Sequence, residues 1–337
     1  MLLTLLPTTS LSCFPIPNHR ASLDPVSTRA SRHHSLAPPW RSAAWSGPPS
    51  LVSKWRCNAG EESEPNPQQQ ASGGLDWPIL QRWEVPWEWP TLSLTFLACG
   101  LSFVLTGLVG TAALPYLGLR IEELSLDEKA EILLVDQGFT TAAVLAVLYG
   151  ITGTFKPLPE DLFRYDLREP FDLRRGWLLW AGVGLSGAVL AIALVGVAMS
   201  FYHGESPERE TDSLVRLLPL IGSSGVSTAC LVAITGVLAP LLEETVFRGF
   251  LMVSLTKWVP TPVAVLISAA VFAFAHLTPG EFPQLFVLGA ALGLIYAQTR
   301  NLLAPITVHA FWNSGVILIL TFLQLQGYDI RDLLQAN

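Results

Sequence analysis

The chain has 337 residues, of which 50% are hydrophobic and only 14% are charged, and its formal net charge is −7. A soluble domain usually carries about 25% charged residues, so this composition excludes an ordinary water-soluble domain and favours an integral membrane protein. Residues 1–60 hold six Lys or Arg and one acid, whereas acids outnumber bases in the rest, which leaves no basic patch for nucleic acid there.

The first region predicted along the chain is a targeting segment. Residues 1–57 are rich in Ser, Pro and Arg and contain a single acid, Asp24, before acids return abruptly at Glu61 and Glu62. Such a composition is typical of an organelle transit peptide, and its hydroxyl residues without a clear Arg-rich amphipathic helix favour a plastid. We therefore expect residues 1–57 to be removed and the mature protein to lie in a chloroplast membrane, either the inner envelope or the thylakoid.

Residues 58–90 are predicted to be a disordered linker that ends in a segment on the membrane surface. The first part is rich in Glu, Pro, Gln and Ser, which is typical of disorder. Tryptophans then cluster at Trp77, Trp83, Trp87 and Trp89. Because tryptophan concentrates at the lipid–water boundary, we expect this segment to lie there, just before the first membrane span.

Apolar runs long enough to cross a bilayer, which takes about 20 residues, fill most of the remaining chain. The candidates are 92–117, 136–153, 176–200, 226–256, 259–277, 282–298 and 302–323. The predicted fold class is therefore all-α, a polytopic membrane helix bundle of about seven spans, with a range of about six to eight. The predicted domains are the N-terminal spans in 91–225, a second membrane domain in 226–323 and a C-terminal tail in 324–337.

Local features refine these helices. Pro240 is expected to kink the long fourth run because proline cannot donate a backbone hydrogen bond. The spacing of Gly289 and Gly293 allows another helix to approach closely. The stretch 155–175 mixes acidic and basic residues in equal numbers and is expected to lie in water.

Ionisable side chains inside lipid are costly and indicate function. From Leu217 to Leu323, those within predicted spans rather than at their ends are Glu243, Glu244, Arg248, His276 and His309. Residues four apart share a helix face, so Glu244 can pair with Arg248, whereas Glu243 is turned by about 100°. His309 shares a face with Asn313 in the same way. Three helices could thus direct two carboxylates, two imidazoles and an amide at one point.

The same residues form three motifs in order. They are Glu243-Glu244-Thr-Val-Phe-Arg248, Phe272-Ala-Phe-Ala-His276 and His309-Ala-Phe-Trp-Asn313, which read EExxxR, FxxxH and HxxxN. With these motifs the chain resembles the CAAX-processing and bacteriocin-processing (CPBP, or Abi) family of intramembrane endopeptidases, as a plastid-targeted plant member. The resemblance covers about residues 226–320, and the first three predicted spans carry no motif.

The resemblance implies a role for each motif residue. Glu243 would act as the general base toward water, and His276 would orient or polarise that water. Glu244 would form a structural ion pair with Arg248. His309 and Asn313 would donate hydrogen bonds to the oxyanion that forms when water attacks a peptide carbonyl. The substrate implied is a membrane protein or a lipidated peptide in the lipid bilayer, and no residue identifies it further.

A metal is left open at this stage. Two histidines and a glutamate form the ligand set of several catalytic zinc sites, and the candidates here are Glu243, His276 and His309. The resembled family has been described both as metalloproteases and as metal-free glutamate proteases. The neutral amide of Asn313 suits an oxyanion donor better than a zinc ligand, which favours an enzyme without a permanently bound metal.

Rival interpretations remain beside the peptidase. A family member without catalytic activity could act as a membrane scaffold or chaperone for plastid membrane proteins. Polar residues that only join helices would gain about 0.6 kcal/mol for each hydrogen bond, which poorly explains two adjacent glutamates. A rhomboid-type serine protease could use Gly222-Ser223-Ser224-Gly225, but that leaves EExxxR unexplained. A proton-relay transporter predicts inverted halves, which the sequence does not display.

Overall fold

The computed structural model describes residues 77–202, 217 and 219–328, and the described part is entirely helical apart from turns and loops. The predicted transit peptide and the start of the linker therefore lie outside the described residues. The N-terminal elements are η2 (Pro78–Leu80), α1 (Trp89–Ala113), η3 (Leu114–Leu117), α2 (Leu126–Thr152), η4 (Gly153–Phe155) and α3 (Trp177–Tyr202). The C-terminal elements are α5 (Gly225–Ala233), η5 (Ile234–Leu238), α6 (Ala239–Glu244), η6 (Thr245–Met252), α7 (Val253–Leu255), α8 (Thr261–Ala275), η7 (Pro279–Glu281), α9 (Phe282–Thr299) and α10 (Leu303–Leu325).

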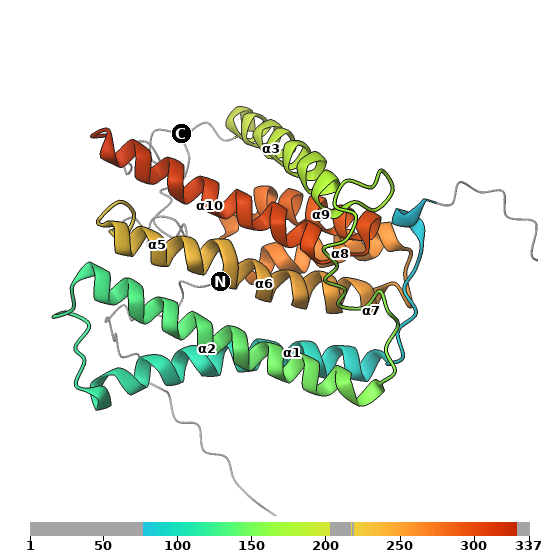
Figure 1. Cartoon of the computed structure of the whole chain (residues 1–337), viewed down its shortest axis with the longest axis horizontal. Helices are drawn as coiled ribbons and strands as arrows, with labels where there is room; N and C mark the ends of the chain where they lie inside the picture. Colours follow the sequence, from blue (N-terminus) through green and yellow to red (C-terminus); the bar gives the residue numbers. More distant parts are fainter. Residues whose placement is uncertain (1–76, 203–216, 218, 329–337) are drawn as a thin grey trace, which may run out of the picture. The chain divides into compact units, whose positions relative to one another are not determined.

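The predicted all-α membrane bundle is confirmed. Within the described ranges, six helices are long and apolar enough to cross a membrane, and α8 is a shorter apolar helix. Figure 1 shows α1 and α2 packed as a pair on one side of the helix from α5 to α7, with α8, α9 and α10 on its other side and α3 outermost. The continuous helix from Gly225 to Leu255 therefore lies in the middle of the bundle.

The second span starts earlier than predicted. Helix α2 begins at Leu126 rather than at residue 136, and Ser125 caps it with a capping box in which Ser125 and Glu128 exchange hydrogen bonds. The acidic residues Asp127 and Glu128 occupy its first turn, where the helix dipole favours negative charge. Their charge lowers the local hydropathy, which is why the apolar run alone placed the start too late.

The helices α8 and α9 form a hairpin. Helix α8 has 15 residues, about 22 Å at 1.5 Å per residue, which is short of the roughly 30 Å hydrocarbon core. Both open ends of the hairpin reach one carbonyl oxygen, that of Gln81, through Thr261 Oγ1 at 3.0 Å and Arg300 Nη2 at 2.9 Å. The predicted fifth span at 259–277 thus enters the bundle and the chain returns along α9 to the same end.

Close packing holds this hairpin together. A Cβ atom added to Gly289 of α9 would lie 3.1 Å from Ala269 and 3.2 Å from Phe272, both in α8. One added to Gly293 would lie 2.9 Å from Val265. The close helix contact predicted from the spacing of these two glycines is confirmed, because any side chain there would collide with α8.

The long central helix contains π-helical segments rather than a simple proline kink. The segment η5 directly precedes Ala239 and Pro240, and η6 directly follows Glu244. A π-turn widens the helix locally and re-satisfies backbone groups that a proline leaves unpaired, and such turns are frequent at functional sites. The two glutamates therefore end a short α-helical stretch that lies between two widened turns.

The tryptophan segment differs from the prediction. Trp77 and Trp89 are exposed, but Trp83 and Trp87 are buried in the protein core. The ring of Trp83 stacks on Tyr296 at 5.4 Å, and Trp87 Nε1 donates a hydrogen bond to Ser254 Oγ at 2.8 Å. The expectation that the whole segment lies on the membrane surface is wrong for these two residues, because the protein interior offers them ring and hydroxyl partners.

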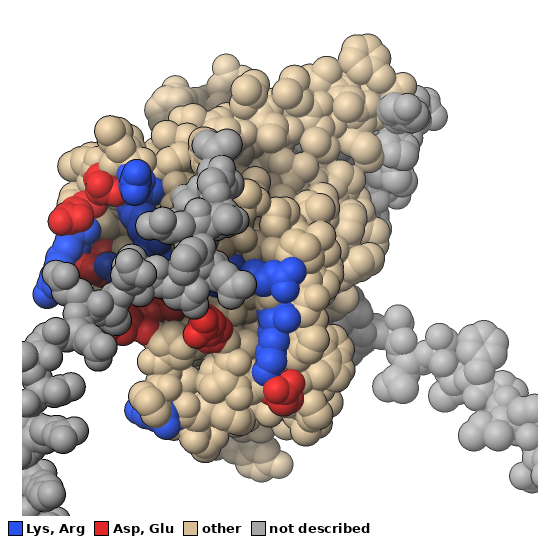
Figure 2. Space-filling model, turned by 90° about the vertical axis from the view of Figure 1, so that its right-hand side faces the viewer, with Lys and Arg blue, Asp and Glu red and all other residues tan. Residues whose placement is uncertain are grey.

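The loop between η4 and α3 covers the end of the bundle toward which the tryptophan segment and α7 also run. Figure 2 faces this end and shows Lys and Arg intermixed with Asp and Glu on its left and lower part, with uncharged surface above and to the right. Arg300 pairs with Asp161 of this loop, and Arg164 pairs with Asp166 at 2.6 Å. The hydrogen bond from Arg164 lowers the pKa of Asp166, so that carboxylate keeps its charge in the mixed surface that the sequence predicts.

Ser224 has a structural role at the start of α5. It is the N-cap of α5, accepting a hydrogen bond from the Ser227 backbone N–H, and its own hydroxyl donates to the carboxylate of Asp127 in α2. Ser227 Oγ donates to the same carboxylate at 2.8 Å. The GxSG match therefore lies at the start of α5, which is hydrogen-bonded to α2. This start is at the opposite end of the bundle from the charged loop between η4 and α3 (Figure 1).

Candidate active site

The candidate site is built around the end of α6, where Glu243 and Glu244 follow each other. Glu244 and Arg248 have fully buried side chains and form an ion pair of 2.8 Å between Oε1 and Nη1. Arg248 Nη2 also donates to the carbonyl oxygen of Gly289 at 3.0 Å, and its guanidinium lies 4.4 Å from the centre of the Phe272 ring. The predicted i,i+4 pair thus exists and connects the central helix with the α8–α9 hairpin.

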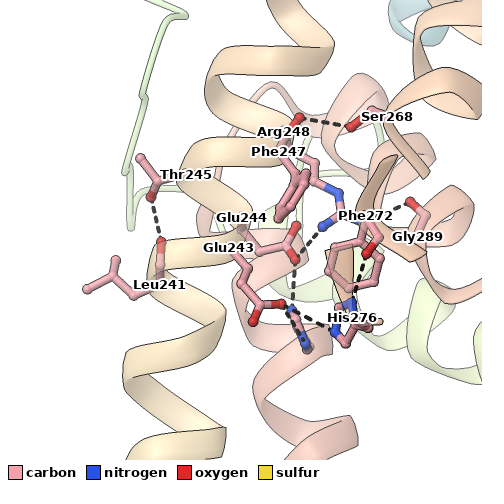
Figure 3. A network of polar contacts seen from close by, with 11 residues as sticks. Leu241, Glu243, Glu244, Thr245, Phe247, Arg248, Ser268, Phe272, His276 and Gly289 are labelled. Atoms are coloured by element: carbon pink, nitrogen blue, oxygen red, sulfur yellow. Dashed lines mark hydrogen bonds and ion pairs between the residues drawn. The ribbon is translucent and has the colours of Figure 1, made fainter. Parts of the chain in front are cut away.

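Glu243 points away from this pair toward the two imidazoles. Its Oε2 atom lies 3.9 Å from His276 Nε2 and 4.0 Å from His309 Nε2. The same oxygen is buried and has no hydrogen-bond partner among the described residues. Figure 3 shows the carboxylates of Glu243 and Glu244 diverging from one helix, with His276 facing Glu243. The structure therefore brings together three groups from three helices, as the motif spacing predicts.

In each of the two histidines, Nδ1 forms a hydrogen bond and Nε2 faces Glu243. The hydrogen bond at Nδ1 indicates which nitrogen carries the proton when the ring is neutral. His276 Nδ1 lies 2.7 Å from the carbonyl oxygen of Phe272, which can only accept, so Nδ1 carries the proton. His309 Nδ1 lies 2.8 Å from Oε1 of Glu244, a carboxylate that likewise accepts. In the neutral imidazoles the Nε2 atoms are therefore acceptors, and both are directed at Glu243.

The remaining motif residues occupy defined positions around this centre. Phe272 is fully buried, with its ring centre 4.6 Å from that of His276 and 5.8 Å from that of His309. It packs against both imidazole rings and under the guanidinium of Arg248, while His309 also contacts Glu244 of the ion pair directly. Asn313 lies one turn beyond His309 in α10, and its Nδ2 donates to the carbonyl oxygen of Thr235 at 2.9 Å. The side chain of Asn313 is thus hydrogen-bonded to the π-helical segment η5.

A residue that the sequence did not indicate also reaches the site. Tyr165, in the charged loop, has its hydroxyl 2.7 Å from Thr245 Oγ1 and 3.2 Å from the hydroxyl of Tyr149. Thr245 directly follows Glu244 and donates to the carbonyl oxygen of Leu241 at 2.6 Å. The loop therefore holds the widened turn after the glutamates through a chain of hydroxyls. No pattern in the sequence links these positions, because they are far apart and carry common residue types.

The geometry allows a test of whether a zinc ion fits the candidate ligands. Zinc holds nitrogen and oxygen ligands at about 2.0–2.2 Å in a tetrahedron, which separates two ligand atoms by about 3.4 Å. The separations from Glu243 Oε2 are 3.9 Å and 4.0 Å. A hydrogen-bonded water, about 2.8 Å from each partner, fits the wider spacing, and no group of three ligand side chains in the described ranges qualifies as a metal site.

The part of the chain that contains this site is similar to known proteins. The model of the type II CAAX prenyl endopeptidase Rce1-like family matches residues 225–315. The UPF0177 protein YxdF of Lactococcus lactis is 31% identical over 191 residues, which are 55% of this chain and 98% of YxdF. No solved structure matches this chain. The matched family region begins at α5 and ends within α10, so it contains every motif residue.

Two further relatives match at lower sequence identity. YdiL of Bacillus subtilis, named as a candidate membrane peptidase, is 23% identical over 182 residues, which are 54% of this chain and 70% of YdiL. MroQ of Staphylococcus aureus, named a membrane-embedded CAAX protease, is 26% identical over 163 residues. That match spans 45% of this chain and only 61% of MroQ.

The protein is a helical membrane bundle, and it buries one carboxylate between two imidazoles. These are chemical groups that an intramembrane hydrolase can use. The family follows from the match over nearly the whole of YxdF together with the family model. This chain belongs to the Rce1-like CAAX protease family.

Proposed function

We propose that this protein is an intramembrane endopeptidase that hydrolyses a peptide bond of a membrane-embedded or lipidated protein. The observation that supports the proposal is the Glu243 Oε2 atom, which is buried, has no hydrogen-bond partner among the described residues and faces Nε2 of both His276 and His309. A charged group costs about 2.5–3.5 kcal/mol at the centre of a membrane helix. A structural role would satisfy that carboxylate with hydrogen bonds, whereas a base needs it free.

The tautomers define how a water molecule would be held. Both Glu243 Oε2 and the Nε2 atom of His276 accept hydrogen bonds, so each would take one hydrogen of the same water. The water oxygen would then present a lone pair to the substrate carbonyl carbon. As the new C–O bond forms, one proton passes to Glu243. Glu243 then delivers it to the leaving nitrogen as the C–N bond breaks, and the products are a carboxylic acid and an amine.

His309 and Asn313 would stabilise the oxyanion that forms on the carbonyl oxygen. A protonated His309 can donate from Nδ1 to Glu244 and from Nε2 to the oxyanion at the same time. The Asn313 amide nitrogen has two hydrogens, of which the bond to Thr235 uses one. Donors that are fixed in advance in a dry site typically contribute a few kcal/mol each to transition-state stabilisation.

The substitution Glu243→Gln tests catalysis against the scaffold alternative. Glutamine is nearly isosteric, but its amide cannot accept the proton of water, so cleavage of a membrane peptide by the purified full chain should fall by about 10²–10⁴-fold. His276→Ala should do the same, with protein levels unchanged. The control Glu131→Gln, on an exposed position of α2, should keep full activity. Activity that persists with a chelator, in protein without stoichiometric zinc, is the second expected result.

A scaffold predicts the opposite outcome in cells. A scaffold needs its surface and its fold, so Glu243→Gln at normal abundance should complement a null mutant. Such complementation would overturn the peptidase proposal and favour a scaffold or chaperone for plastid membrane proteins. Loss of function at normal abundance would support hydrolysis.

We also propose that the mature protein lies in a chloroplast membrane after removal of residues 1–57. The support is the acid-poor, Ser- and Arg-rich composition of that segment. Mass spectrometry of the native protein should find a first residue near Asn58. Recovery of peptides from residues 10–50 in the mature protein, or residence in the endoplasmic reticulum, would contradict the assignment.

A further inference from the structure

A cavity of about 320 Å³ lies directly beside Glu243, between α1, α2, α6 with η6, and α8. Helix α1 contributes Phe96, Cys99, Gly100 and Phe103 to its wall. Apart from Glu243 itself, the lining side chains are hydrocarbon, aromatic or the thiol of Cys99, with no cation among them. None of the motifs includes α1, so the function proposed above leaves this cavity unexplained.

The cavity borders the lipid between α1 and α8. Helix α1 packs mainly on α2, and α8 packs mainly on α9 and η6, so the two helices face each other across the cavity without extensive direct packing. Phe274 of α8 lines the cavity and is 67% exposed, and Leu97 and Leu101 of α1 are also exposed nearby along that helix. Exposed apolar side chains of a membrane helix face lipid, so a membrane-embedded chain can reach Glu243 from this side.

The chemistry of the wall selects a neutral, apolar occupant. The nearest guanidinium, that of Arg248, is fully buried and is bonded to Glu244 and to the carbonyl oxygen of Gly289. Its Nη1 and Nη2 atoms are therefore already engaged, and Glu243 would repel a carboxylate or phosphate. Small-molecule pockets run from about 300 to 1,000 Å³, and this cavity is at the lower limit, which suits one bulky side chain rather than a whole lipid.

We propose that this cavity receives one large apolar side chain of the substrate, leucine- or phenylalanine-sized, next to the bond that is cleaved, and that Gly100 sets its size. A Cβ atom added to Gly100 would meet no atom within 4 Å. Gly100 lines the cavity, so a longer side chain there extends into the space that the substrate would fill. The inference rests on the peptidase function proposed above and names the substrate feature that the same site reads.

The test uses the purified full chain in lipid vesicles and membrane-embedded peptides with either Phe or Ala on each side of the scissile bond. One bulky apolar group is worth about 10–200-fold in kcat/KM in a hydrophobic pocket, so the wild type should prefer Phe by at least about tenfold. Gly100→Leu should lower cleavage of the Phe peptide by at least about tenfold and leave the Ala peptide nearly unchanged. Gly100→Ala should give an intermediate ratio.

The control is Gly187→Leu on an exposed face of α3, where an added Cβ atom also meets nothing within 4 Å. It should change neither peptide. Cleavage of the Ala peptide by Gly100→Leu shows that this variant is folded. An unchanged Phe-to-Ala ratio in Gly100→Leu would overturn the cavity assignment while leaving the peptidase intact, whereas a wild type that cleaves neither peptide would contradict the proposed function instead.

A binding measurement separates the two failures even without turnover. A peptide that carries a photoreactive benzophenone analogue of phenylalanine at the preferred position should crosslink to residues 96–103 of α1 in the Glu243→Gln background. Adding Gly100→Leu should reduce that yield by at least about fivefold, in line with the loss in kcat/KM. Crosslinks that form elsewhere, on α3 for example, would contradict the proposed cavity.

Discussion

The central helix, Gly225–Leu255, and helix α3 have nearly the same mean hydropathy, 2.0 and 2.2, yet their most apolar windows are 44% and 11% buried inside the protein. Hydropathy measures how well a segment dissolves in lipid and does not say whether it faces lipid or other helices. The two helices differ in their polar residues: the central helix carries Glu243, Glu244 and Arg248, whereas α3 has no acidic or basic residue. Glu243, Glu244 and Arg248 therefore distinguish the central helix from α3, whereas hydropathy does not.

The largest expected effect on stability is that of breaking the buried pair. Arg248→Ala leaves Glu244 charged and buried, and losing one partner of a buried ion pair typically costs about 3–5 kcal/mol. Glu244→Gln should act in the same direction because it removes the negative charge that pairs with Arg248 and faces His309, although the amide oxygen can still accept a hydrogen bond. Steady-state abundance and thermal unfolding in detergent measure the loss. The control Arg175→Ala, in the exposed loop, should stay within about 0.5 kcal/mol.

An Arg248→Ala variant that accumulates and unfolds like the wild type would mean that the pair adds nothing to the fold. The contrast between the central helix and α3 would then be one of burial alone.

A smaller effect is expected from filling the close contact between α8 and α9. Gly289→Leu forces a side chain against Ala269 and Phe272, and overpacking typically costs about 1–3 kcal/mol. Gly187→Leu, on an exposed face of α3, should cost little, since its side chain would point into lipid. Unfolding of both variants in detergent compares them directly. Equal losses would show that α3 is as tightly packed as the hairpin, which would remove the contrast.

Hydropathy predicted which segments form membrane helices, but not where two of them begin or end. Asp127 and Glu128 hid the start of α2, although Ser125 and Glu128 are spaced as a capping box and carry that signal in the sequence. The turn after α8 also left a signal, because Pro279 and Gly280 follow the apolar run. Burial was harder to foresee. Trp83 lies beneath the guanidinium of Arg300, 4.3 Å from it, and this pairing exists only in the folded chain.

The convergence of Glu243, His276 and His309 was predictable because Glu243 is turned away from the Glu244–Arg248 pair, and each histidine has a motif partner at helical spacing, Phe272 or Asn313. Details that depend on contacts between helices were not. The bond from Asn313 to the Thr235 carbonyl requires a widened π-turn in another helix. The hydroxyl chain from Tyr165 requires a loop to fold back over the bundle. Sequence spacing carries information within one helix, whereas these contacts are decided by how helices meet.

The α8–α9 hairpin does not change which sides of the membrane the two ends of the described chain face. It leaves and returns beside the same Gln81 carbonyl oxygen, so it contributes either two crossings or none. One of the six candidate spans, α9, belongs to this hairpin. The other five candidate spans are an odd number. If all five cross the bilayer, Trp77 and Tyr328 are expected to face different aqueous compartments. A soluble factor that binds next to α1 at its start thus cannot also reach the end of α10 without crossing the bilayer.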